Sequence, residues 1–185
     1  MKYLLMILIS SSLTLVVDTS FAGESNEVKI KRAMSAAPKA ISHNATIIDA
    51  DGSILQKGNN GWTCMPDTMP NDKSPICNDA VWMKALKALG TKAPFTPESI
   101  GISYMLKGDV TSGVSNSTPY HPDHQNAKDY VKTGPHMMII VPKALLKNLP
   151  TDPKSGGPYV MWGDTPYAHI MIPIDDTKMK HSHGH

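Results

Sequence analysis

The sequence predicts an α+β fold, a single compact domain with a largely antiparallel sheet and two or three helices. Short β-prone runs recur along the chain, helical periodicity is confined to a few segments, and neither an internal repeat nor a linker divides the chain. A chain of this length buries roughly two thirds of its unfolded surface in one domain without needing a cofactor to fold.

The first 22 residues have the pattern of a secretory signal peptide. Lys2 precedes an apolar run from Tyr3 to Val17, and the stretch closes on Ser20-Phe21-Ala22, a small-x-small cleavage pattern. The run is too short and too polar to span a membrane. We therefore expect a signal peptide over 1–22, one α+β domain over 23–176 and a flexible histidine-containing tail over 177–185. The mature chain is expected to be periplasmic or secreted, with no stable membrane insertion.

Helices are expected at three places. The segment 26–36 is amphipathic, and Asn78 or Asp79 can cap a helix whose apolar residues recur at helical spacing until Gly90 stops it. The segment 143–148 suggests one or two further helical turns.

Strands are expected on both sides of a hairpin turn at Asp51-Gly52, a dipeptide typical of two-residue turns, and at four later places. The long polar stretch 108–134 is expected to be irregular, and a loop of that length is either functional or mobile. The six predicted strands are 45–49, 53–56, 100–106, 136–142, 159–162 and 168–174.

The two cysteines, Cys64 and Cys77, are predicted to form a disulfide, because an exported chain meets oxidising conditions. The bond would close a loop of about 14 residues and contribute about 3 kcal/mol. A redox or metal-binding thiol pair is the alternative, but redox pairs have the closer Cys-x-x-Cys spacing.

The formal net charge of +2 argues against nucleic-acid binding, since the basic residues are few and scattered. The sequence specifies neither a protein partner nor an oligomeric state.

Two His-x-Met triplets form the sharpest pattern in the chain, each at the start of a predicted strand: His136 with Met138, and His169 with Met171. Side chains two residues apart share one face of a strand. If the strands are neighbours in register, two imidazoles and two thioethers converge, a donor set that suits Cu(I). The alternative is structural, since methionine commonly fills core gaps.

A second cluster, His121, Asp123 and His124, could form an open zinc site of the kind that activates a bound water. Pro122 prevents the pair from lying within a regular helix, and a solvated loop explains the polar residues equally well.

The tail carries alternating histidines at His181, His183 and His185, which bind metals adventitiously. Metal retention by these residues would say nothing about a site in the domain.

Three proline–tyrosine pairs and the three tryptophans suggest an apolar or carbohydrate-binding groove, because tyrosine and tryptophan offer a flat face with a polar edge. Core and turn packing is the alternative explanation. The groove candidates are Trp62, Tyr159, Trp162 and Tyr167.

Three segments resemble parts of exported bacterial proteins that have no assigned activity: Asn60–Cys64, Gly134–His136, and the stretch from Gly157 to His169. The resemblance implies export and a single domain, and it implies no catalytic residue.

Together these patterns favour an exported binding or accessory protein over an enzyme. We expect it to bind copper or another soft metal through the paired triplets. One alternative is a small-ligand or carbohydrate-binding module with the aromatic groove. Another is a zinc-dependent hydrolase that uses the 121–124 cluster.

Overall fold

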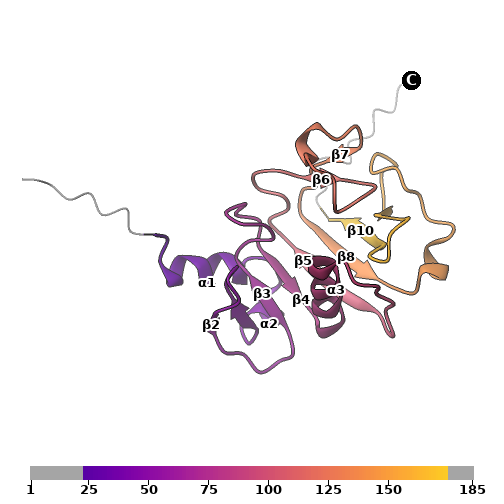
Figure 1. Ribbon diagram of the computed structural model, residues 1–185. Coiled ribbons are helices and arrows are strands. Elements are labelled where there is room, and N and C mark those ends of the chain that lie inside the picture. The colour runs from indigo at the N-terminus through magenta and orange to yellow at the C-terminus, as the bar shows by residue number, and fades with distance from the viewer. Residues whose placement is uncertain (1–22, 175–185) are drawn as a thin grey trace, which may run out of the picture.

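Eight short strands form one sheet in the computed structural model, which describes residues 23–174 (Figure 1). The order across the sheet is β2-β1-β3-β4-β5-β8-β10-β9, and every neighbouring pair is antiparallel except β1 and β3. The strands of this sheet are β1 (Thr46–Ile48), β2 (Ile54–Gln56), β3 (Thr63–Met65), β4 (Ile76–Asn78), β5 (Gly101–Met105), β8 (His136–Ile140), β9 (Tyr159–Met161) and β10 (His169–Pro173).

Three α-helices and two 3-10 turns accompany the sheet, which confirms the predicted α+β class and single domain. They are α1 (Asn26–Met34), α2 (Lys39–Ser42), α3 (Ala80–Thr91), η1 (His124–Asn126) and η2 (Lys143–Leu146). The first helix ends two residues earlier than predicted, because the Ser35 hydroxyl donates to the carbonyl of Arg32 and caps it there.

The predicted hairpin is confirmed. Strands β1 and β2 pair antiparallel around Gly52, whose φ of 83° lies in the left-handed region that glycine adopts freely. The Asp51 carboxylate accepts a hydrogen bond of 2.8 Å from the amide of Ser53 and holds the turn.

Strands β3 and β4 were not predicted, although they carry the two cysteines. Cys64 and Cys77 are direct cross-strand partners and form a disulfide with an S–S length of 2.04 Å. Each strand has only three residues and is joined to the other by a proline-containing loop, so neither shows a readable alternation. The predicted disulfide is present.

Helix α3 begins where predicted and ends later. The Asp79 carboxylate accepts from the amide of Trp82 at 2.8 Å and from that of Ile102 at 2.7 Å, so it caps the helix and fastens it to β5. The prediction that Gly90 stops the helix was wrong: the left-handed residue is Lys92, with φ 55°. The amides of Lys92 and Ala93 donate to the carbonyls of Leu89 and Ala88. These bonds satisfy the last helical turn without a glycine.

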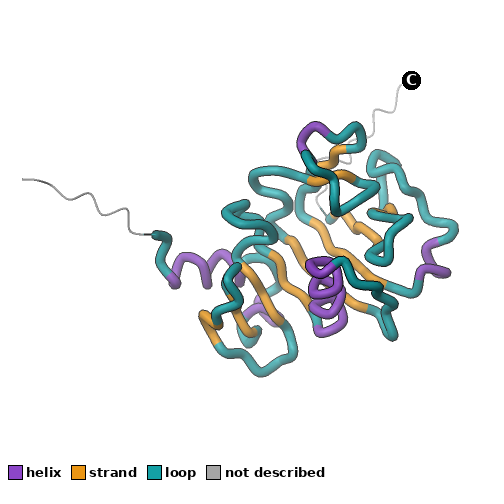
Figure 2. The backbone as a smooth tube through the Cα atoms, viewed as in Figure 1, coloured by secondary structure: helices purple, strands orange, loops and turns teal. Residues whose placement is uncertain are grey.

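The two faces of the sheet are covered differently. Adjacent residues of one strand belong to different core clusters: Cys77 packs with α1, whereas Ile76 packs with α3. Figure 2 shows α3 lying across the central strands. At Gly101 on β5, an added Cβ would meet Ile140 at 2.5 Å and Val81 at 2.9 Å, so glycine allows the helix to approach the sheet closely.

The predicted irregular stretch 108–134 is mainly loop, but hydrogen bonds fix it. It contains a small two-stranded sheet of β6 (Val114–Ser115) and β7 (Tyr130–Val131), at the top of Figure 1. The Asp129 carboxylate accepts from the Ser115 hydroxyl at 2.9 Å and from the Ser117 amide at 2.7 Å. This excursion covers one side of the cavity described below.

The predicted signal peptide and histidine tail lie outside the described residues. Within residues 23–174, no helix has the length and apolar character needed to cross a membrane.

Candidate metal-binding cavity

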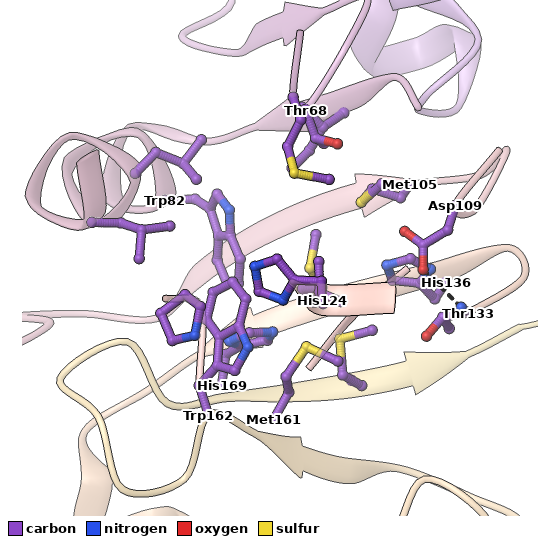
Figure 3. Close-up of a pocket in the computed structure, with 18 residues that line it drawn as sticks. Thr68, Trp82, Met105, Asp109, His124, Thr133, His136, Met161, Trp162 and His169 are labelled. Atoms are coloured by element: carbon purple, nitrogen blue, oxygen red, sulfur yellow. Dashed lines mark hydrogen bonds between the residues drawn. The ribbon is translucent and has the colours of Figure 1, made fainter. Parts of the chain in front are cut away.

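A cavity of about 210 Å³ lies between the α3-covered face of the sheet, helix α3 itself and the 108–134 excursion (Figure 3). The strands supply its floor, α3 one wall, and Val114, Pro119 and His124 of the excursion another. Its lining residues are Thr68, Met69, Ile76, Trp82, Leu86, Leu89, Met105, Asp109, Val114, Pro119, His124, Thr133, His136, Met138, Met161, Trp162, His169 and Met171.

Soft donors are concentrated in this cavity. Five of the twelve methionines of the chain line it, together with three of the eight histidines. Thioether sulfur and imidazole nitrogen are the ligands that soft metals prefer. The cavity therefore has the chemical character of a soft-metal site as well as that of an apolar pocket.

The two His-x-Met triplets lie on adjacent antiparallel strands, β8 and β10, and all four side chains line the cavity. Met138 and Met171 are direct cross-strand partners. The histidines are at opposite ends, because the register that pairs Ile170 with Ile139 sets His136 and His169 four residue steps apart, about 13 Å along the strands. The structure thus brings the two thioethers together and separates the two imidazoles.

Each histidine has a second methionine beside it that the sequence analysis missed. Met161 on β9 is the cross-strand partner of His169, and Met105 on β5 is the cross-strand partner of His136. Both methionines are buried, at 4% exposure. Directly paired residues have Cβ atoms about 4.5–5.5 Å apart, so each imidazole lies beside a thioether.

The hydrogen bonds of these histidines leave the same nitrogen free. Nδ1 of His136 lies 2.7 Å from the Gly134 carbonyl oxygen, and Nδ1 of His169 lies 2.9 Å from that of Tyr167. A carbonyl only accepts, so in both rings Nδ1 carries the proton and donates it, and Nε2 keeps a lone pair. Burial lowers the pKa of both to about 4, so both are neutral near pH 7.

Two indole rings enclose His169. The ring centroids of Trp82 and Trp162 lie 5.2 Å and 5.0 Å from that of the imidazole, each in an edge arrangement. Trp162 has a φ of 55°, an uncommon value for a bulky side chain, and its indole nitrogen donates to the Ser115 carbonyl at 3.0 Å. Such backbone strain costs on the order of 1–3 kcal/mol and is often found at functional sites.

Two polar atoms of this part of the cavity have no partner. Nε2 of His169 and Nε1 of Trp82 are buried without a hydrogen bond, one an acceptor and the other a donor. Leaving a buried polar group unpaired costs roughly 1–3 kcal/mol, so such groups call for an explanation.

The other end of the cavity carries a carboxylate. Asp109 accepts a hydrogen bond of 2.7 Å from the amide of Thr133, and both residues line the cavity near His136 (Figure 3). Burial raises the pKa of Asp109 to about 6. This end is therefore more polar than the end that holds His169.

The structure does not assemble the predicted zinc cluster of His121, Asp123 and His124. His121 accepts at Nδ1 from the amide of Asp123, and His124 accepts at Nδ1 from that of Ser115, so in the neutral rings both Nε2 atoms carry the proton. In residues 23–174, no group of three or more His, Cys, Asp and Glu side chains is placed to hold a metal. His124 instead lines the cavity, where its Nε2–H is a donor.

The predicted aromatic groove is not assembled either. Of the four groove candidates only Trp162 lines the cavity, whereas Trp62 packs against Tyr104 in the core cluster on the opposite face. Tyr159 is 1% exposed. The hydroxyl of Tyr167 donates to the carbonyl of Ala93 at 2.6 Å, beyond the end of α3.

The sequence gives little indication that Met105, Met161 and Trp82 line the cavity. Met105 ends one predicted strand and Met161 lies within another, each at a position whose face depends on the pairing. Trp82 is one of the apolar residues that recur at helical spacing in the predicted helix. The pairing and register of the strands decide which of these residues line the cavity, and neither can be predicted from a single sequence.

No protein-family model matches this chain, and neither a curated protein nor a solved structure matches it. The candidate functions therefore rest on the geometry and chemistry of the cavity.

Proposed function

We propose that this protein binds the soft metal ion Cu(I) in the cavity, at a site formed by His169, Met161 and Met171. The observation that carries the proposal is the buried, unpaired Nε2 lone pair of His169 beside two thioethers. A bound ion would supply the partner that this nitrogen lacks.

The backbone brings these three side chains to one place. Met161 is directly opposite His169, and Met171 is two residues along the same strand and on the same face, about 7 Å away at Cα. Methionine has three rotatable bonds and adjusts to its surroundings. The two thioethers can therefore turn toward an ion at the fixed imidazole nitrogen.

The surroundings favour Cu(I) over harder ions. The three ligands are neutral, and imidazole and thioether are soft donors, whereas Mg²⁺ and Ca²⁺ prefer oxygen. The indole rings of Trp82 and Trp162 contact the imidazole of His169, and aromatic rings of this kind can attract a desolvated cation. A single positive charge costs less to bury there than a double one.

An extracytoplasmic location is part of the proposal. The disulfide between Cys64 and Cys77 is compatible with an oxidising compartment. The signal-peptide pattern of residues 1–22 agrees with export to the periplasm or beyond. There the protein would handle copper rather than catalyse a reaction.

The test is an anaerobic Cu(I) titration against a chromogenic chelator that competes for the ion. The protein is the chain with His181, His183 and His185 replaced by asparagine, so that the tail does not bind. We expect tight binding that is weakened by more than about tenfold in Met161→Leu, since even outer-shell changes cost that much. This substitution conserves volume and costs under about 1.5 kcal/mol of stability.

The matched control is His43→Gln, which removes an exposed histidine and should bind like the parent. An unchanged affinity in Met161→Leu, or the absence of Cu(I) binding by the folded parent, would show that the proposal is wrong.

A small organic ligand is the second candidate, favoured by the unpaired indole N–H of Trp82 beside the unpaired nitrogen of His169. A ligand with one acceptor and one donor would satisfy both atoms. Imidazole is a suitable probe, because it carries one of each. Its binding, measured by Trp fluorescence and lost in Trp82→Phe, would favour this candidate.

A further inference from the structure

We infer that the cavity holds a second Cu(I) site, formed by His136, Met105 and Met138 at the end opposite His169. The inference deepens the proposed function and rests on it for the first ion. It follows from a symmetry of the sheet that neither triplet shows alone.

Strands β8 and β10 are antiparallel, so a local two-fold axis relates them, and it passes between the paired residues Met138 and Met171. Rotation about this axis exchanges the two His-x-Met triplets. It also exchanges the outer neighbours of the pair, β5 and β9.

The outer strands carry the same residue type at the equivalent place. Met161 on β9 is the cross-strand partner of His169, and Met105 on β5 is the cross-strand partner of His136. Each end of the cavity therefore has a histidine, a methionine two residues along its strand and a methionine directly opposite.

The protonation of the second histidine matches that of the first. Nδ1 of His136 donates to the carbonyl two residues earlier, as Nδ1 of His169 does, so Nε2 keeps its lone pair in both. His136 is 1% exposed, Met105 4% and Met138 6%. All three line the cavity (Figure 3).

A single ion cannot take both imidazoles at their present positions. The two histidines are four residue steps apart in register, about 13 Å along the strands, whereas a nitrogen ligand lies near 2 Å from its metal. Two ions, one at each end, use all six histidine and methionine side chains that β5, β8, β9 and β10 place in the cavity.

The surroundings of the two ends differ, and that difference provides separate readouts. The indoles of Trp82 and Trp162 contact His169, so an ion there should quench tryptophan fluorescence. The end at His136 is bordered by Asp109 and Thr133, so an ion there should leave the fluorescence nearly unchanged.

The experiment is an anaerobic Cu(I) titration of the full chain with asparagine at the three tail histidines. Two readouts monitor the titration: competition with the chelator counts all bound ions, and tryptophan fluorescence detects an ion beside His169. We expect two ions per chain in the parent. Met105→Leu and His136→Gln should each bind one ion and retain the whole fluorescence change, whereas His169→Gln should bind one ion with little change.

The outcomes separate this inference from the proposed function. One ion in the parent, with full quenching and no effect of Met105→Leu, overturns the second site and leaves the first. One ion that is lost in His136→Gln and causes no quenching overturns the first site. No binding overturns both. Met105→Leu conserves volume, so it keeps the test valid if His136→Gln fails to fold.

Discussion

The two faces of strands β8 and β10 differ in composition and packing, although successive residues of each strand contribute to them in turn. On one face, Ile139 and Ile170 pack with Val160 and Leu146 in an aliphatic cluster closed by the η2 turn. On the other face, the residues adjacent in sequence include Met138, His169 and Met171, which line a cavity with unpaired polar atoms. We call them the closed face and the cavity face.

The comparison separates the residues that stabilise the fold from those that we propose to bind Cu(I). A close-packed aliphatic face leaves no space and no polar atom unsatisfied, so it contributes stability. A face with a cavity and buried, unpaired imidazole loses dispersion contacts and hydrogen bonds. The cavity face is therefore tolerated because the closed face and the disulfide offset its cost.

The largest expected effect is acid sensitivity that comes from the cavity face. Burial lowers the pKa of His136 and His169 from 6.5 to about 4, so between these values each histidine binds more protons in the unfolded chain than in the folded one. Asp109 acts in the opposite direction, because burial raises its pKa from 3.8 to about 6. The stability that depends on the two histidines is complete above about pH 6.5 and falls as the pH drops toward 4, by on the order of 3 kcal/mol per histidine, and protonation of Asp109 offsets part of this loss.

Urea unfolding of the metal-free protein at a series of pH values measures this effect. His169→Leu should flatten the dependence, whereas His43→Gln, at an exposed position, should retain it. Equal curves for parent and His169→Leu would mean that this imidazole is not buried in the neutral form.

The disulfide should give the next largest effect, from the side of the sheet that lacks the cavity. Replacing Cys64 and Cys77 by alanine should lower the free energy of unfolding by about 3 kcal/mol. Under conditions where the variant remains folded, Cu(I) affinity should match that of the parent. Loss of binding in the folded variant would show that the two sides of the sheet are coupled.

Gly101→Ala tests the close approach of α3, which forms a wall of the cavity. The added methyl group would lie 2.5 Å from Ile140 and 2.9 Å from Val81, so we expect a loss of about 1–3 kcal/mol by thermal or urea unfolding. Gly90→Ala in the same helix is the control. Nothing lies within 4 Å of its added Cβ, and it should gain up to about 1 kcal/mol.

Single substitutions at two adjacent residues of β10 should have the smallest effects on stability. They compare the two faces of the sheet directly. Ile170→Val on the closed face should cost about 0.5–1.5 kcal/mol, and Met171→Leu on the cavity face less than about 1.5 kcal/mol. Only Met171→Leu should weaken Cu(I) binding in the chelator assay. Equal affinities for the two variants would remove Met171 from the ligand set.

Local patterns predicted much of the fold. Asp51-Gly52 located the hairpin, and Asp79 with the apolar stripe located α3, because turn and capping preferences act within a few residues. The three-residue strands β3 and β4 escaped prediction, since pairing with distant strands stabilises them. Lys92 replaced Gly90 as the helix end because its position allowed two backbone hydrogen bonds.

The candidate site was predicted in part. The alternation within each triplet placed His136 with Met138, and His169 with Met171, on one face of their strands. The expectation that both imidazoles meet depended on a register that the sequence does not contain. The histidines of the 121–124 cluster accept hydrogen bonds from backbone amides at Nδ1. Among the groove candidates, Trp62 packs in a different core cluster from Tyr159 and Trp162.

By itself, the sequence determined the α+β class, the hairpin, the main helix, the disulfide partners and the faces of the two triplets. All of these follow from interactions between residues close in sequence or from there being only two cysteines. The tertiary structure alone decided the strand order, the separation of the imidazoles and the placement of Met105, Met161 and the indoles beside them. Those features depend on the pairing of strands that are far apart in sequence. A shift of one residue in the register would move each side chain of a strand to the opposite face of the sheet.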